Sequence, residues 1–181
     1  MRRRGSYGTT RTMKRYDLIN EAIRKGGYSR YLEIGLRDGR CFDRIECEFK
    51  HSVDPDFSRR AATYRMTSRQ FWRTYGGPVY DVIFVDGSHL AEEVLNDLEN
   101  AISFIQIHGA VFVHDVYPEA REHTHRAYSG RGTWNGDAWK AWVHFKRRHP
   151  ELQFKLHEDD HGVGEVRYRP LTFEDDLWLV K

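Results

Sequence analysis

The sequence predicts an α/β fold built around a doubly wound, mostly parallel sheet. Short apolar stretches alternate along the chain with stretches in which apolar residues recur at helical spacing, a pattern typical of this fold class. The stretch 80–86 is predominantly apolar, as expected for a parallel strand covered on both faces. A turn with two glycines, Gly35 and Gly39, follows the first expected strand, and Asp54 follows the second. Such sheets bind ligands at the carboxyl ends of their strands, which is where these residues fall.

The first half of the chain shows one clear helix and three short strands. A helix is expected over 12–25, because apolar residues recur there at helical spacing and Gly26 and Gly27 stop it. The strands are expected at three positions: 30–35, 50–54 and about 63–67. A helix after the glycine turn should hold Cys41 and Cys47 on different faces, so no disulfide is expected between them.

The second half continues the alternation and then changes character. A helix over 90–106 carries one apolar stripe, and the strand that follows it covers 109–115. Asp137 is expected to cap the next helix. The chain then ends in three segments that could be strands: 152–157 and 163–168, joined near His161-Gly162, and 177–180, which is either an edge strand or a packing tail.

Length and composition indicate a single domain over residues 11–181, preceded by a flexible basic arm at 1–10. A chain of 181 residues has the usual size of one domain with a substantial core. The net charge is only +2, so the charge balance does not support nucleic-acid binding, and the basic run 146–148 is interpreted as a helix end. No apolar run approaches the roughly 18 residues that span a bilayer, so a cytoplasmic protein is expected.

The glycine turn indicates the kind of ligand. It has the pattern E-x-G-x-x-x-G, from Glu33 through Gly35 to Gly39. Glycine is needed where the backbone turns sharply and passes close to a ligand. A carboxylate at Glu33 would repel a phosphate, while Asp54 can accept hydrogen bonds from both ribose hydroxyls. A pocket for a cationic nucleoside without phosphates follows, and S-adenosylmethionine fits it.

Two later motifs extend the pattern. Residues 80–89 read YDVIFVDGSH, and residues 109–115 read GAVFVHD. With the glycine turn and Val53-Asp54-Pro55, their order and spacing over about residues 15–120 resemble the class I S-adenosylmethionine-dependent methyltransferases. The D-G-x-H and H-D motifs are most similar to those of small-molecule O-methyltransferases, including metal-dependent enzymes that act on macrolide sugars.

This resemblance implies a seven-stranded Rossmann-like sheet with a C-terminal antiparallel hairpin. It also implies methyl transfer from S-adenosylmethionine to an oxygen of a small hydroxylated acceptor, sugar-like or a natural product. Glu33 and Gly35 would line the methionine end of the cofactor, and Asp54 would hold the ribose. Thr67 and Ser68 would border the adenine. The full set of cofactor residues expected from the motifs is Glu33, Gly35, Gly39, Asp54, Pro55, Thr67, Ser68, Asp86 and Gly87.

His89 is the candidate general base. Transfer to a hydroxyl requires that the acceptor be oriented and its proton removed or weakened. His89 lies three residues beyond Asp86, at the mouth of the expected strand, and histidine titrates near neutral pH. The alternative is a histidine at a helix start that bonds only to backbone.

Asp86 and Asp115, which end adjacent strands, are the candidate metal ligands. Two carboxylates at neighbouring strand ends suit Mg²⁺ or Mn²⁺, which would also acidify a bound hydroxyl. His114 is expected to point away from Asp115, because successive strand residues face opposite sides. Alternatively, Asp86 only orients the methionine ammonium and Asp115 caps a helix or a turn. The catechol-type enzymes carry an acidic residue and Asn after this strand, where this chain has His114-Asp115-Val116, which weakens the case for a metal.

The stretch 117–136 is too polar and rich in glycine for a core element, and it is interpreted as a substrate lid or a disordered loop. Its His123 and His125 have a spacing that could chelate zinc or iron, although loop histidines are more often solvated. Trp134 is assigned a mixed role between lid and packing, and Trp142 is expected in the core.

Two other functions stay open on the sequence alone. One is a metal-dependent hydroxylase or hydrolase on the same fold, since related hydroxylase sequences share the D-G-x-H and H-D motifs. The other is a non-catalytic module that binds nucleosides. The partner of an enzyme would be a small-molecule acceptor whose identity the sequence does not indicate. The oligomeric state is open, with a homodimer among the alternatives.

Overall fold

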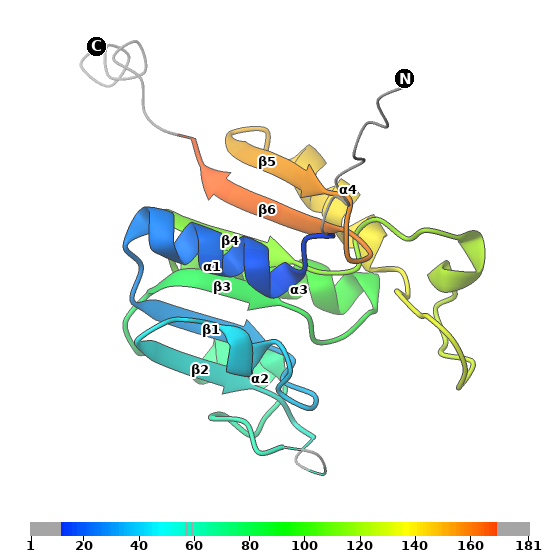
Figure 1. Cartoon of the computed structure of the whole chain (residues 1–181), viewed down its shortest axis with the longest axis horizontal. Helices are drawn as coiled ribbons and strands as arrows, with labels where there is room; N and C mark the ends of the chain where they lie inside the picture. Colours follow the sequence, from blue (N-terminus) through cyan, green and yellow to red (C-terminus); the bar gives the residue numbers. More distant parts are fainter. Residues whose placement is uncertain (1–11, 57, 59, 170–181) are drawn as a thin grey trace, which may run out of the picture.

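The computed structural model describes residues 12–56, 58 and 60–169, and these form a Rossmann-like α/β sheet (Figure 1). Its six strands lie in the order β2-β1-β3-β4-β6-β5. The strands are β1 (Arg30–Ile34), β2 (Phe49–Val53), β3 (Tyr80–Val85), β4 (Ile105–Val113), β5 (Leu152–His157) and β6 (Val163–Tyr168). The first four are parallel, and β6 pairs antiparallel with both β4 and β5. The predicted fold class and C-terminal hairpin are therefore confirmed.

Helices cover the two faces of the sheet unequally. In Figure 1, α1 (Arg15–Gly26) lies in front of the sheet, while α2 (Ser68–Thr74), α3 (Ala91–Ser103) and α4 (Ala138–Arg148) lie behind it. Each face has its own apolar core, and strand residues divide between the cores by alternation. Tyr31 of β1 packs on the α1 side, whereas Leu32 packs on the other. Trp142 is in the larger core, as predicted.

The strand predicted at about 63–67 is absent from the described residues. Tyr64 forms one isolated bridge with Val53, and its ring packs against Phe71 and Tyr75 at centroid distances of 5.0 and 6.1 Å. Thr67 then starts α2 with a capping box, its hydroxyl accepting from the backbone N–H of Gln70 at 3.2 Å. Aromatic packing and the early helix start leave no length for a strand, so the sheet has six described strands rather than seven.

The prediction of a helix after the glycine turn is also wrong. Between Cys41 and Cys47, both free thiols, there is only the single 3₁₀ turn η1 (Phe42–Arg44). Side chains from other elements bind the backbone groups that a longer helix would use: Lys50 Nζ donates to the carbonyls of Phe42 and Ile45, and Asn20 of α1 bonds the carbonyl of Arg44 and the N–H of Glu46.

Other element limits shift by a few residues. α3 ends at Ser103 rather than 106, and β4 starts at Ile105 rather than 109, because Ile105 already pairs with Tyr80 before a register shift. Within the described residues, no helix is both long and apolar enough to cross a membrane. The arm predicted at 1–10 and the segment 177–180 lie outside the described part of the chain.

Candidate active site

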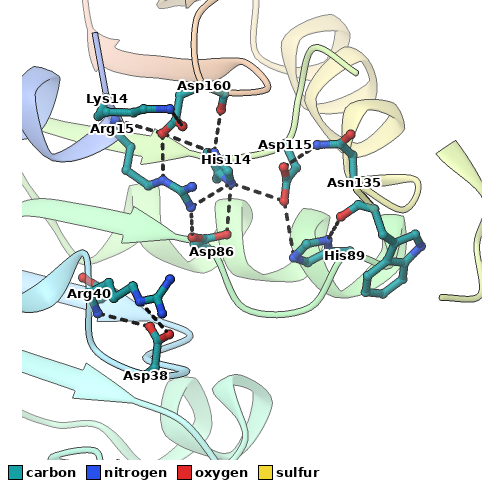
Figure 2. Close-up of polar contacts among 12 residues, drawn as sticks. Lys14, Arg15, Asp38, Arg40, Asp86, His89, His114, Asp115, Asn135 and Asp160 are labelled. Carbon is teal, nitrogen blue, oxygen red and sulfur yellow. Dashed lines mark hydrogen bonds and ion pairs between the residues drawn. The ribbon is translucent and has the colours of Figure 1, made fainter. Parts of the chain in front are cut away.

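The carboxyl ends of β3 and β4 bring Asp86, His114 and Asp115 together (Figure 2). Each offers one ligand atom, and these atoms lie within 4.8 Å of one another. His114 Nδ1 is 3.2 Å from Asp86 Oδ1 and 3.2 Å from Asp115 Oδ2. We call these three residues the acid–histidine cluster. It unites the two predicted carboxylates and adds a histidine.

The expectation that His114 and Asp115 point apart is wrong. Alternation of side chains holds only while the backbone is extended, and β4 ends at Val113. Asp115 has φ +61°, a left-handed conformation that is uncommon for residues other than glycine. This turn directs the Asp115 carboxylate back beside His114.

The two aspartates determine the charge of His114 in this structure. Burial by itself would lower the pKa of His114, but the neighbouring Asp86 and Asp115 carboxylates raise it to about 10. Conversely, burial would raise the pKa of Asp86, and the positive charges of His114 and Arg15 hold it well below its usual range. The His114 imidazolium and the Arg15 guanidinium thus balance the negative charge of the carboxylates.

His89 lies at the outer side of the cluster, with Nε2 3.3 Å from Asp115 Oδ2. Its Nδ1 is 3.1 Å from the carbonyl oxygen of Trp134, and the two rings stack with centroids 4.6 Å apart and planes at 12°. The carbonyl accepts a hydrogen bond if Nδ1 carries the proton. In the neutral ring Nε2, which faces the cluster, is then the nitrogen without a proton. The contact to Trp134 orients the ring and could not be read from the sequence.

Asn135 is a site residue that the sequence reasoning missed. It is fully buried, and its Nδ2 donates to Asp115 Oδ1 (Figure 2). Next to it, Gly136 has φ +60°, and a Cβ there would overlap the backbone of His89. The end of the long loop is therefore built against both His89 and Asp115. Only the Asn-Gly pair itself hinted at a special conformation.

A second group missed from the sequence joins α1 to the turn between β5 and β6. Arg15 Nη1 is 2.8 Å from Asp86 Oδ2, and Arg15 Nε is 2.9 Å from Asp160 Oδ2. Lys14 Nζ lies 2.9 Å from the other oxygen of Asp160, whose carbonyl is 2.7 Å from His114 Nε2. The chemistry of Arg15 and Asp160 depends on contacts between residues about 145 positions apart, for which the sequence shows no signal.

The glycine turn passes directly over the end of β3. Gly35 has φ +91°, and a Cβ there would collide with the backbone of Asp86 and Gly87, so only glycine fits. Asp54 Oδ2 accepts from the backbone N–H groups of Leu36 at 2.8 Å and Arg37 at 2.9 Å. The predicted ribose residue thus also shapes the turn.

Glu33 is placed differently from what its charge suggested. It is 2% exposed, and its Oε2 accepts from the Tyr31 hydroxyl at 2.6 Å. Burial, only partly opposed by that hydrogen bond, raises the pKa of Glu33 to about 8, which favours the protonated form at neutral pH. The negative charge near the end of β1 therefore comes from Asp86 more than from Glu33.

The remaining predicted cofactor residues do not bond to the acid–histidine cluster. The Thr67 hydroxyl caps α2, and Ser68 bonds to Asp97 of α3. Gly39 has φ +77°, Pro55 is exposed after β2, and Gly87 lies at the end of β3.

The loop over 117–136 contains the short 3₁₀ turn η2 (Arg121–Thr124) and lines a partly open cavity of about 400 Å³. His123 and His125 line this cavity and do not join Asp86, His114 and Asp115, the one group of three convergent ligands among the described residues. The His123–His125 pair therefore has no third metal ligand in the described part of the chain. Asp137 does not cap α4 with its side chain, because its Oδ1 accepts from the N–H of Ala91, the first residue of α3.

Comparison with known proteins identifies the family. Residues 17–116 match the model of a methyltransferase domain family, more than half of the chain. The chain belongs to this family. The predicted class I S-adenosylmethionine-dependent methyltransferase is thereby confirmed, and the matched region includes the glycine turn, His89 and the acid–histidine cluster. No curated protein matches the sequence.

Solved structures share the fold at low identity. A Podospora anserina methyltransferase solved with SAH is 14% identical, with a TM-score of 0.62 over 85% of this chain and 77% of that one. An O-methyltransferase from Bacillus cereus in complex with SAH is 11% identical, with a TM-score of 0.62 over 89% of this chain and 84% of that one. An O-methyltransferase from Streptomyces achromogenes involved in tomaymycin synthesis, in complex with SAM, is 11% identical, with a TM-score of 0.60 over 84% of this chain and 78% of that one.

Proposed function

We propose that this methyltransferase transfers the methyl group of S-adenosylmethionine to a hydroxyl oxygen of a small acceptor, sugar-like or a natural product. The observation that carries this proposal is His89, whose Nε2 lies 3.3 Å from Asp115 Oδ2, at the rim of the acid–histidine cluster. The O-methyltransferases among the structural neighbours support the oxygen acceptor, and family membership favours methyl transfer over the hydroxylase or nucleoside-module alternatives.

The chain's own residues fit the cofactor. Gly35 lets the turn pass directly against the backbone of Asp86 and Gly87, and Asp54 holds the turn through two backbone N–H groups. The carboxylate of Asp54 still has lone pairs for ribose hydroxyls. Thr67 and Ser68 stay proposed neighbours of the adenine, although both already have intramolecular partners. S-Adenosylmethionine, when bound, supplies an electrophilic methyl group.

His89 would remove the acceptor proton at Nε2. The Trp134 carbonyl 3.1 Å from Nδ1 holds the tautomer, and the stacked indole fixes the ring plane. Asp115, itself fixed by Asn135, stabilises the imidazolium that forms. The adjoining loop, with its cavity of about 400 Å³, is the proposed acceptor side of the site.

The donor set also fits a divalent cation. Two carboxylates and an imidazole converge in the acid–histidine cluster, and such oxygen and nitrogen ligands suit Mg²⁺ or Mn²⁺. Asp86, Asp115 and His114 would hold the ion. When bound, it would acidify the acceptor hydroxyl.

Ligand binding and a methylation screen together test the proposal. Calorimetry should detect S-adenosylmethionine and S-adenosylhomocysteine in the micromolar range, and NAD should not bind. Mass spectrometry of reactions with phenols, catechols and glycosides should then find products heavier by one methylene unit. Methyl transfer to nitrogen or carbon acceptors alone would contradict the oxygen chemistry.

A further inference from the structure

Arg15 occupies an unusual place for a cation. It is the first residue of α1, preceded by Lys14 at the N-cap, and the positive end of a helix dipole disfavours cations there. Its guanidinium instead reaches two carboxylates, Asp86 at 2.8 Å and Asp160 at 2.9 Å. Asp17 stabilises the start of the helix by accepting from the backbone N–H of Lys14, so the cation at Arg15 is explained by the site rather than by the helix.

Asp160 fixes the direction of the guanidinium. Its Oδ2 accepts from both the backbone N–H of Arg15 at 3.1 Å and Nε at 2.9 Å. Asp160 itself has φ +56°, a costly conformation that persists only where surrounding contacts impose it. With Nε held, the terminal nitrogens of Arg15 lie toward Asp86 (Figure 2). Within the described residues, Nη2 of Arg15 has no hydrogen-bond partner, so it can donate to a ligand.

The two oxygens of Asp86 face different neighbours. Oδ1 is directed to His114 and the rest of the acid–histidine cluster, whereas Oδ2 is directed to Arg15. An α-amino acid carries an ammonium and a carboxylate on neighbouring atoms. An aspartate and an arginine side by side present the complementary charges in the same close arrangement, and a guanidinium matches a carboxylate with two parallel hydrogen bonds.

We propose that Arg15 binds the carboxylate of the methionine part of S-adenosylmethionine, while Asp86 Oδ2 accepts from its ammonium. This inference rests on the proposed cofactor site, in which the methionine end lies at Gly35 and Asp86. Arg40, another guanidinium near the glycine turn, is paired with Asp38 at 3.1 Å and is 84% exposed (Figure 2). The Arg15–Asp86 ion pair keeps the two side chains ordered before the cofactor binds. On binding, this ion pair is replaced by two ion pairs with the cofactor, one from Arg15 to its carboxylate and one from Asp86 to its ammonium.

The test compares two ligands in each of several variants. S-Adenosylmethionine and its decarboxylated form both contain the adenosine, the sulfonium and the ammonium, and differ in the carboxylate. The wild type should bind the complete cofactor about 10–100-fold more tightly than the decarboxylated form, since hydrogen bonds between charged groups contribute that much. In Arg15→Met the ratio should fall to about 1, and Arg15→Lys should give an intermediate ratio.

Arg24→Met is the matched control, because Arg24 lies on the same helix in an exposed ion pair with Glu46. It should keep the wild-type ratio. The ratio is measured within one protein, so a general loss of folded protein cancels, and Arg15→Lys carries the test if Arg15→Met does not fold. Equal weakening of both ligands in the Arg15 variants would overturn the inference. Failure of the wild type to bind S-adenosylhomocysteine as well would instead refute the cofactor site itself.

Discussion

At the scale of single residues, His89 combines two contacts that serve different purposes. Nδ1 meets the Trp134 carbonyl, and Nε2 faces Asp115. A histidine that only started a helix would need the first of these contacts but not the second. The position of Nε2 beside a buried carboxylate is what distinguishes a base from a structural residue here.

Replacing His89 with alanine should separate catalysis from binding. We expect His89→Ala to lower kcat by about 10²–10⁴, the usual contribution of a general base, with little change in the affinity for S-adenosylhomocysteine. Steady-state kinetics and calorimetry measure the two quantities. His144→Ala is the control, because His144 is exposed on α4 and belongs neither to the acid–histidine cluster nor to the lining of the loop pocket. Unaltered turnover in His89→Ala would assign the proton to another group.

Asp54 should affect both the cofactor and the fold. Asp54→Ala removes the acceptor for two backbone N–H groups of the glycine turn and for the ribose, so S-adenosylhomocysteine should bind about 10–100-fold more weakly and Tm should fall. Asp54→Asn keeps one acceptor oxygen, so its affinity for S-adenosylhomocysteine and its Tm should lie between those of the wild type and Asp54→Ala. Calorimetry and thermal unfolding report the two effects. Wild-type affinity in Asp54→Ala would place the ribose elsewhere.

At the scale of elements, the loop 117–136 differs between its middle and its end. Trp134, Asn135 and Gly136 contact His89 or Asp115, whereas residues 127–133 are exposed. The lid predicted from the sequence therefore stays a prediction for the exposed part. The end of the loop belongs to the wall of the site.

Trypsin can distinguish these parts. Cleavage should occur first after Arg121 and Arg131, which are exposed, and later after Arg126, whose guanidinium binds Glu92 and Asp137. Cofactor with acceptor should slow all three cuts if the loop closes over the site. Mass spectrometry of timed digests identifies the sites. Resistance of the loop equal to that of the sheet would show a fixed element.

The C-terminal hairpin has its own pH dependence. Burial would raise the pKa of Glu165, but hydrogen bonds from His157 and Arg167 outweigh it and lower the pKa to about 2. A lowered folded-state pKa stabilises the protein above the unfolded value near 4.5, and this contribution is lost as pH falls toward 2. Glu165→Gln should thus reduce the free energy of unfolding by about 1–2 kcal/mol at pH 7, allowing for solvent screening. The difference from wild type should shrink below pH 4 in urea titrations.

At the scale of the whole molecule, the site joins distant parts of the chain: α1, the ends of β3 and β4, the end of the loop 117–136 and the β5–β6 turn. Because β6 inserts antiparallel between β4 and β5, the turn that precedes it lies against His114 and Arg15.

Excess EDTA should abolish most turnover, and Mg²⁺ or Mn²⁺ should restore it, if the acid–histidine cluster holds a metal. Full turnover in EDTA would leave catalysis to His89 without an ion.

The sequence by itself determined the parallel α/β core, the C-terminal hairpin, the family and the residues at the strand ends. These follow from local signals: apolar periodicity, glycines spaced in the turn after a strand, and acidic residues placed directly after strands. Gly35 and Asp86 were both predicted at such ends, and the structure brings them into contact.

Only the tertiary structure decided the convergence of His114 with Asp115, the orientation of His89, and the roles of Arg15, Asn135 and Asp160. It also replaced a predicted strand and a predicted helix with Tyr64 packing and a 3₁₀ turn. The physical reason is that contacts between side chains and other parts of the chain determined the local conformation. Asn20 at Arg44, Asn135 at Asp115 and Asp160 at Arg15 act over long sequence separations, while the Tyr64–Phe71 ring contact and the Lys50 hydrogen bonds join residues closer in sequence, and periodicity and motif spacing do not report either kind.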